Sequence, residues 1–151
     1  MNAMNRKKTG LMLGTLALSS MLLVGCNSGN EYHPNAEPTQ LSAYAATKPY
    51  PANAQAQEDS RITAVVNGQS GQLTIRNFSG GPLQDVDVWI NQAYVLHVNH
   101  IGANGSISLS PADFYNANGQ SLGKTPPEGI RKVQIETRDR QLYNAQGPQI
   151  E

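Results

Sequence analysis

The sequence predicts an all-β fold: a small antiparallel β-sandwich of about seven strands, preceded by a signal peptide and a flexible linker. Three observations lead to this prediction. Short apolar segments recur roughly every 8–12 residues between turn residues, which is typical of sandwiches. The chain of 151 residues holds 14 glycines and 9 prolines, and only 15% of its residues are charged. No segment keeps a helical spacing of apolar residues over about ten positions, so a coiled coil is excluded.

Each expected strand is an alternation of apolar and polar residues that ends at a turn. The clearest is 86–90, where valine, valine and isoleucine occupy every second position and therefore share one face. Asn67-Gly68 favours a hairpin turn after the first strand. The expected elements are strands at 62–66, 73–77, 86–90, 94–98, 107–109, 130–135 and 142–143, a 3₁₀ turn at 111–115 and a loop at 116–124. An open barrel is the main alternative to the sandwich.

The N-terminus has the features of a targeting segment. One arginine and two lysines at 6–8 precede an apolar run at 10–24. As a helix this run would span about 22 Å, which is short of the roughly 30 Å hydrocarbon core of a bilayer. A positive segment followed by a short apolar run is the layout of a secretory signal peptide. The run ends in Leu-Val-Gly-Cys at 23–26, which resembles the lipobox of bacterial lipoproteins.

That resemblance implies a lipid attachment site at Cys26. The signal peptide, residues 1–25, would be cleaved after Gly25 and before Cys26. The cysteine would then carry a diacylglycerol on its sulfur and an acyl chain such as palmitate on its new amino group. Cys26 is the only cysteine of the chain, so no intramolecular disulfide can form. Because each buried methylene contributes about 0.8 kcal/mol, two or three acyl chains would hold the protein on a membrane without spanning it.

The residue after the cysteine bears on localisation. Asn27 follows Cys26, and in enteric lipoproteins, which this segment resembles, a residue other than aspartate at that position permits sorting to the outer membrane. We therefore expect a cell-envelope protein, anchored to the outer membrane and facing the periplasm. If the source has a single membrane, the expectation becomes the outer face of that membrane.

Residues 26–59 are predicted to be a flexible linker. Four of the nine prolines fall there, and no apolar periodicity of either kind is sustained. Such a stretch buries too little apolar surface to offset its ordering entropy. A helical turn at 43–47 and docking of Tyr44 or Tyr50 on the domain are the alternative. The expected organisation is thus signal peptide 1–25, lipid-anchored linker 26–59 and β domain 60–151.

A second resemblance concerns the domain itself. Leu-Thr-Ile-Arg-Asn at 73–77, Ser-Gly-Gly-Pro at 79–82 and Asp-Val-Asp-Val at 85–88 resemble bacterial Ig-like envelope modules. Gly-Ser-Ile-Ser-Leu at 105–109 fits the same group, and the resemblance covers 72–136. It implies an Ig-like β-sandwich with an adhesion, scaffold or accessory role outside the cytoplasm. It carries no catalytic residues.

The sequence offers no recognisable catalytic machinery, so we expect no enzyme, no cofactor and no metal. His97 and His100 are three residues apart in a strand and point to opposite faces. Asp85 and Asp87 share a face at about 7 Å, but a solvated strand surface explains them. A faint calcium-loop pattern at 113–119 is better explained as a turn.

The remaining functions are those of a binding protein. The formal net charge is zero, so no nucleic-acid footprint exists. We expect a membrane-anchored, non-enzymatic lipoprotein whose sandwich is a binding or accessory module for an envelope protein or a cell-wall glycan. A structural subunit of an envelope or secretion complex is the alternative, and a small envelope hydrolase is a weaker one.

The expected binding face is the polar side of strand 86–90. If the apolar residues of this strand point into the core, Trp89 must point the other way, between Asp87 and Asn91. Tryptophan is enriched in binding hot spots and stacks well on apolar faces. The alternative is that a loop or the Tyr50 region covers Trp89 and makes it structural. If Trp89 matters neither for stability nor for binding, the interaction surface is expected in the 116–124 loop instead.

Overall fold

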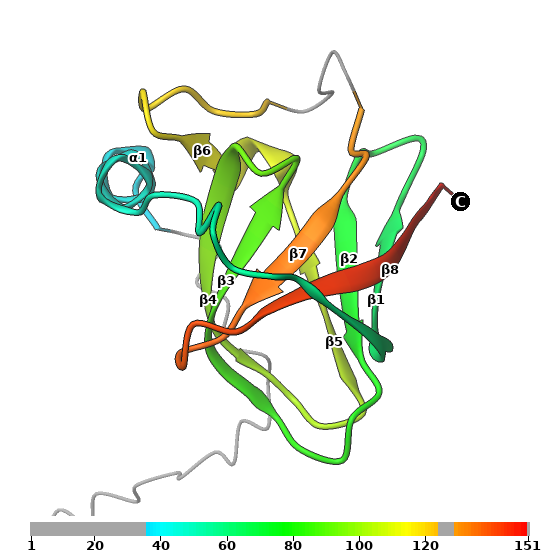
Figure 1. Ribbon diagram of the computed structural model, residues 1–151. Coiled ribbons are helices and arrows are strands. Elements are labelled where there is room, and N and C mark those ends of the chain that lie inside the picture. The colour runs from blue at the N-terminus through cyan, green and yellow to red at the C-terminus, as the bar shows by residue number, and fades with distance from the viewer. Residues whose placement is uncertain (1–35, 124–128, 151) are drawn as a thin grey trace, which may run out of the picture.

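The computed structural model describes residues 36–123 and 129–150, and the fold is all-β as predicted (Figure 1). The predicted signal peptide, Cys26 and residues 26–35 of the predicted linker lie outside the described residues. Within the described ranges, no helix has the length and apolar character needed to cross a bilayer.

Each of the seven expected strands overlaps a strand of the structure, and one short strand is added. The elements in chain order are α1 (Pro38–Thr47), β1 (Gln57–Val66), β2 (Leu73–Asn77), β3 (Leu83–Ile90), β4 (Tyr94–Ile101), β5 (Gly105–Leu109), the 3₁₀ helix η1 (Pro111–Asp113), β6 (Tyr115–Asn116), β7 (Val133–Glu136) and β8 (Leu142–Ile150).

The strands form a single curled sheet in the order β5-β2-β1-β8-β7-β3-β4-β6. The expectation of a purely antiparallel arrangement is wrong at one place, because β1 and β8 pair in parallel. β1 pairs with β2 along one edge and with β8 along the other, and therefore joins two halves of the sheet. Its register against β8 shifts between Asp59 and Thr63, and such irregularities bend a strand.

The curl lets both halves of the sheet contribute to one core. Ile75 and Ile107 come from the half that contains β2 and β5, whereas Val88 and Ile135 come from the half that contains β3 and β7. All four are fully buried or nearly so and belong to the same apolar cluster. The alternation of β3 therefore points its valines and Ile90 inward, as the sequence predicts, and turns its other face away from this core.

That other face is covered by the segment predicted to be a flexible linker. The prediction is wrong for 38–47, which form α1, and for 57–59, which begin β1. α1 has little support of its own: Glu37 makes no side-chain cap, the first turn has no acidic residue and the last turn has no basic residue. Helices this short are marginal in isolation, so the packing of Ala45 and Leu41 against the sheet accounts for its formation.

Ile90→Ala is predicted to lower the free energy of unfolding by about 2–5 kcal/mol, because it leaves a cavity in the core. Urea unfolding of the soluble chain 27–151 measures the change. Phe78→Ala is the matched control. This aromatic side chain is 55% exposed, so its loss should change stability by less than about 0.5 kcal/mol. Equal effects of the two substitutions would contradict the assignment of the core.

Candidate binding site

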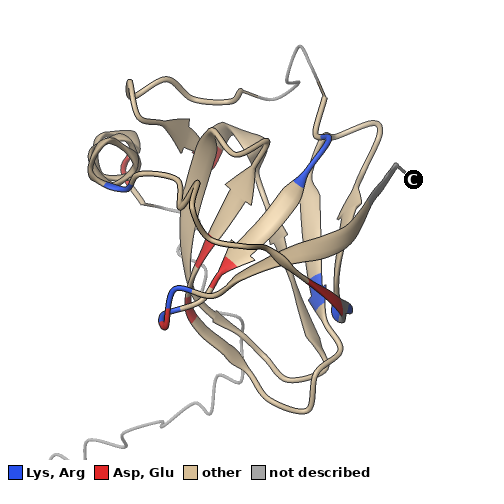
Figure 2. Cartoon of the chain, in the orientation of Figure 1, with Lys and Arg blue, Asp and Glu red and all other residues tan. Residues whose placement is uncertain are grey.

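The outer face of β3 carries a row of polar side chains that continues across neighbouring strands. Asp87 lies opposite His97 of β4 on one side and opposite Glu136 of β7 on the other. Trp89, two residues along, lies opposite Gln134 of β7. Acidic positions on β3 and β7 are therefore side by side beneath the segment that leaves α1 (Figure 2). Two carboxylates this close require compensating charge.

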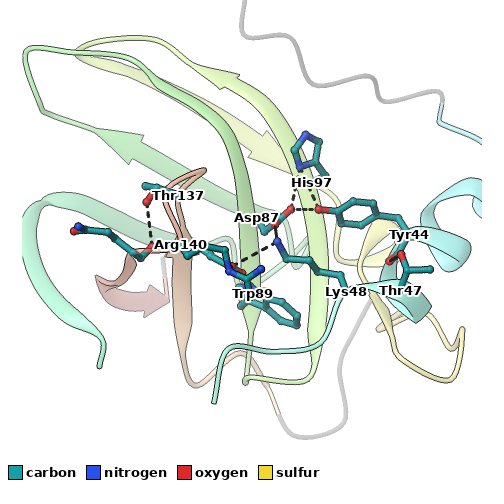
Figure 3. A network of polar contacts seen from close by, with 10 residues as sticks. Tyr44, Thr47, Lys48, Asp87, Trp89, His97, Thr137 and Arg140 are labelled. Carbon is teal, nitrogen blue, oxygen red and sulfur yellow. Dashed lines mark hydrogen bonds and ion pairs between the residues drawn. The ribbon is translucent and has the colours of Figure 1, made fainter. Parts of the chain in front are cut away.

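Lys48, the residue after α1, supplies part of that charge. Its Nζ lies 2.5 Å from Asp87 Oδ2 and 3.5 Å from Glu136 Oε1. The other oxygen of Asp87, Oδ1, accepts a hydrogen bond from the hydroxyl of Tyr44 at 2.5 Å and lies 2.9 Å from His97 Nδ1 (Figure 3). These five residues, which we call the charge cluster, join the helical segment to β3, β4 and β7.

Glu136 is the most deeply buried member, with its side chain 1% exposed. Its Oε2 accepts a hydrogen bond from Trp89 Nε1 at 3.1 Å. Its Oε1 lies 3.2 Å from Arg140 Nε and within ion-pair distance of Lys48, yet neither cation makes a well-aligned hydrogen bond to it. The compensation of this carboxylate is therefore mainly electrostatic and comes from two cations that lie on different sides.

The pKa values of the charge cluster follow from these contacts. Burial raises the pKa of Asp87, but the hydrogen bonds from His97, Lys48 and Tyr44 outweigh it and bring that pKa below its usual value. The hydrogen bond to Asp87 raises the pKa of His97, although burial opposes the change. Burial, followed by the contact with Asp87, raises the pKa of Tyr44. Asp87 is thus ionised and Tyr44 stays protonated as its donor, an arrangement that holds α1 on the sheet.

Trp89 points away from the core, as predicted, but it is not exposed to solvent. It is 2% exposed, and Tyr50 packs on it edge-to-face with ring centroids 5.2 Å apart. Asp87 is buried as well. The prediction of an open binding face is therefore wrong, and the alternative in which the Tyr50 region covers Trp89 is confirmed. The cause is the docking of α1 and the chain that follows it.

Asn91, the third residue of the expected face, holds a loop in position. Its backbone is left-handed, with φ 50°, in the turn between β3 and β4. Its side-chain oxygen accepts hydrogen bonds from the backbone N–H groups of Arg131 and Lys132, and its amide donates to the carbonyl of Gly129. These three bonds fasten the segment before β7 to the turn, which explains an asparagine at this position.

The other polar residues singled out in the sequence separate in the structure. His100 pairs with Gln84, so it does not meet His97. Asp85 is half exposed and lies 3.7 Å from Arg138, whereas Asp87 is buried. Across residues 36–123 and 129–150, no cluster of His, Cys, Asp and Glu is arranged to hold a metal ion.

A pocket of about 310 Å³ opens beside the charge cluster. One wall is formed by the end of α1 and the residues after it, the other by the β3–β4 turn and the start of the predicted 116–124 loop. Its lining residues are Ala45, Lys48, Pro49, Tyr50, Trp89, Gln92, Ala93, Val95, Asn116, Ala117 and Asn118. Trp89 and the loop singled out in the sequence therefore both line this pocket.

The two walls of the pocket are held by side-chain and backbone contacts. Gln92 Nε2 donates to the Tyr50 hydroxyl at 2.9 Å, and that hydroxyl donates to Gln134 Oε1 at 2.8 Å. On the loop side, Asn116 Oδ1 accepts from the backbone N–H groups of Asn118 and Gln120. The pocket therefore has a shape fixed by the protein itself, which is typical of ligand sites.

Sequence reasoning missed Lys48, Gln92 and Glu136. The alternation of Val133 and Ile135 already directs Gln134 and Glu136 to the face opposite the core, so one signal for Glu136 was present. Lys48 lies in a segment without periodicity. Gln92 carries no signal, because its role depends on a turn conformation and on Tyr50.

Trp89→Ala is predicted to destabilise the soluble chain 27–151 by about 3–5 kcal/mol, as a core truncation would. Trp89→Phe keeps an aromatic ring but removes the donor to Glu136, and should cost about 1–3 kcal/mol. Urea unfolding of both variants beside the parent measures these values. A change below about 1 kcal/mol for Trp89→Ala would mean that the tryptophan behaves as a surface residue.

The stability of the same chain is predicted to fall as the pH rises from mildly acidic to alkaline. The pKa of His97 is raised in the folded state, so its contribution is complete below the unfolded pKa of about 6.5 and is lost above the folded pKa. Because its side chain is 35% exposed, the loss should not exceed about 1 kcal/mol. The lowered pKa of Asp87 affects stability at acidic pH. The stabilisation that the ionised Asp87 provides is present above about pH 4 and is lost on further acidification.

His97→Gln is the control for this pH dependence. Urea unfolding across the pH range should give a flatter alkaline limb for the variant than for the parent. If the parent and His97→Gln lose stability in parallel on the alkaline side, the ion pair between His97 and Asp87 does not contribute.

Comparison with protein-family models, with curated proteins and with solved structures found no match to this chain. The resemblances of the N-terminus to a lipobox and of residues 72–136 to Ig-like modules therefore stay predictions. The function has to be argued from the residues themselves.

Proposed function

We propose that this chain is a lipid-anchored envelope protein whose β domain is a non-enzymatic binding module. The observation that carries the proposal is the position of its only cysteine. Cys26 ends an apolar run that follows a positive segment, in a sequence that resembles a lipobox. The mature protein would be held by acyl chains on Cys26 in the outer membrane, facing the periplasm, and would bind an envelope protein or a cell-wall glycan.

The docked helix supports a location close to the membrane. With α1 packed on the sheet, only ten residue steps separate Cys26 from Ala36, the first described residue. Ten steps span at most about 36 Å when fully extended. The domain would therefore work within a few nanometres of the bilayer surface, a range that suits a ligand of the envelope itself.

The pocket supports the binding role. Lys48, the charged residue of its lining, is paired with Asp87 and lies near Glu136, and both carboxylates accept hydrogen bonds from neighbouring side chains. In this arrangement the ionisable groups stabilise the fold and the wall of the pocket. What the pocket offers to a ligand is apolar surface with a few amide groups, which is the usual composition of a binding site.

Cys26→Ser is predicted to remain an unprocessed, signal-bearing precursor without lipid. Metabolic labelling with a radioactive fatty acid should mark the parent and the control Ser28→Ala, but not Cys26→Ser. Label on the Cys26→Ser protein would refute the anchor. In membrane fractionation the parent should follow outer-membrane markers, and recovery only with inner-membrane markers would refute the proposed location.

A further inference from the structure

The pocket beside Trp89 has a chemical character that narrows its ligand. Its lining contains no carboxylate and no guanidinium group, and Lys48 is its one charged side chain among the described residues. The Nζ of Lys48 is already ion-paired with Asp87. A charged ligand would find no free counter-charge in this lining, and burying an unpaired charge is costly. The pocket therefore suits an uncharged ligand.

The polar groups that remain are amides at the rim. The Nε2 of Gln92 donates to the hydroxyl of Tyr50. The Oε1 of Gln92 remains as an acceptor without a partner among the described residues. The side chain of Asn118 is exposed and makes no hydrogen bond in that part of the chain. Carbonyl oxygens accept from hydroxyl groups, and an amide nitrogen donates to them. Beside these amides the apolar surface comes mainly from Tyr50, Ala93 and Ala117, and the buried side chains of Trp89 and Val95 lie behind it.

The conformation of the β3–β4 turn fixes the position of Gln92. Its φ is 62°, a left-handed conformation that costs free energy for a residue other than glycine or asparagine. Asn91 precedes it in the same conformation and offsets part of this cost through its three bonds to the segment before β7. Positive φ at both central residues is what a tight hairpin turn requires, and the N–H of Ala93 donates to the carbonyl of Ile90 across this turn. The turn places Gln92 where its side chain reaches Tyr50 at the pocket.

An extended peptide fits this place less well. Peptides commonly bind by adding a strand to a free sheet edge. β6 is the edge strand beside the pocket, and its outer side is already used by the chain itself. The N–H of Asn116 donates to the carbonyl of Gln120, and Tyr115 forms a bridge with Ser121. Along β6, in the described part of the chain, no free ladder is therefore offered next to the pocket.

From these observations we propose that the pocket between Tyr50, Gln92 and Asn118 binds one unit of a neutral saccharide, with its hydroxyl or acetamido groups on the rim amides and its apolar face on the aromatic side. The volume of about 310 Å³ is at the lower end of ligand sites and suits a single sugar ring with its substituents. This inference rests on the proposed function, because it names the ligand class of the same module.

The chain holds a single tryptophan, so tryptophan fluorescence, excited where tyrosine does not absorb, reports on the surroundings of Trp89 at the wall of this pocket. We would titrate the full chain, purified from membranes in detergent, with N,N′-diacetylchitobiose, with cellobiose and with glucuronic acid as the charged probe. The neutral disaccharides should give a saturable change and glucuronic acid should not. Saturation by glucuronic acid alone, or no saturable change with any neutral saccharide up to tens of millimolar, would overturn the proposal.

Gln92→Gly and Asn118→Ala are the test variants, and Gln69→Ala in the exposed β1–β2 turn is the matched control. Gln92→Gly removes the amide and also relieves the left-handed strain, so the protein should stay folded. We expect each test variant to bind the disaccharide roughly tenfold more weakly, the range of one lost hydrogen bond, and the control to bind as the parent does. Equal affinities of all three variants would overturn the proposal.

An uncharged, end-blocked alanine–proline tetrapeptide is the competing probe. If it saturates the fluorescence change and the saccharides do not, the ligand class is wrong while the binding module stands. Fatty-acid labelling of Cys26 is read separately, so a protein that binds saccharide but carries no lipid would refute the anchor and leave this site intact.

Discussion

The carboxylate of Asp87 joins the two parts of this molecule. It lies on β3, between β7 and β4, and contacts Tyr44 and Lys48 of the helical segment and His97 of the neighbouring strand β4. A buried carboxylate is costly to desolvate, and removing one partner of such a set leaves an uncompensated charge. The position of α1, the cover over Trp89 and one wall of the pocket all depend on this group.

The periodicity of the sequence was sufficient to predict the strands and the direction of their side chains. Val88 and Ile90 point inward and Trp89 outward, as the alternation requires. The alternation could not predict which residues cover Trp89. Tyr50 is separated from it by almost forty residues and belongs to a stretch with no apolar period, so the contact arises from tertiary packing that no local pattern encodes.

The same limit applies to the topology and to the site. Alternation indicates that a strand exists, but not which strand becomes its neighbour or in which direction, so the parallel pairing of β1 with β8 could not be predicted. The pocket combines three segments distant in sequence: the end of α1, the β3–β4 turn and the loop after β6. The loop after β6 could be singled out beforehand because it is rich in asparagine and glycine, and Tyr50 because a tyrosine in that segment is able to dock on the domain. The position of Gln92 at the pocket could not be predicted from the sequence, because its backbone conformation is set by the geometry of the turn.

The weak intrinsic stability of α1 has a mechanical consequence. The helix lies between the proposed lipid anchor and the charge cluster, and its attachment is concentrated at its C-terminal end, at Tyr44 and Lys48. Ten residues measure about 15 Å as a helix and about 35 Å when extended. A pull along the chain would unravel the helix from its N-terminal end, and the six residues before Tyr44 would lengthen the connection by about 12 Å before the force reached the hydrogen bond between Tyr44 and Asp87. If the chain is anchored as proposed, α1 would extend first under tension, and the contacts of Tyr44 and Lys48 with Asp87 would limit the force that reaches the sheet.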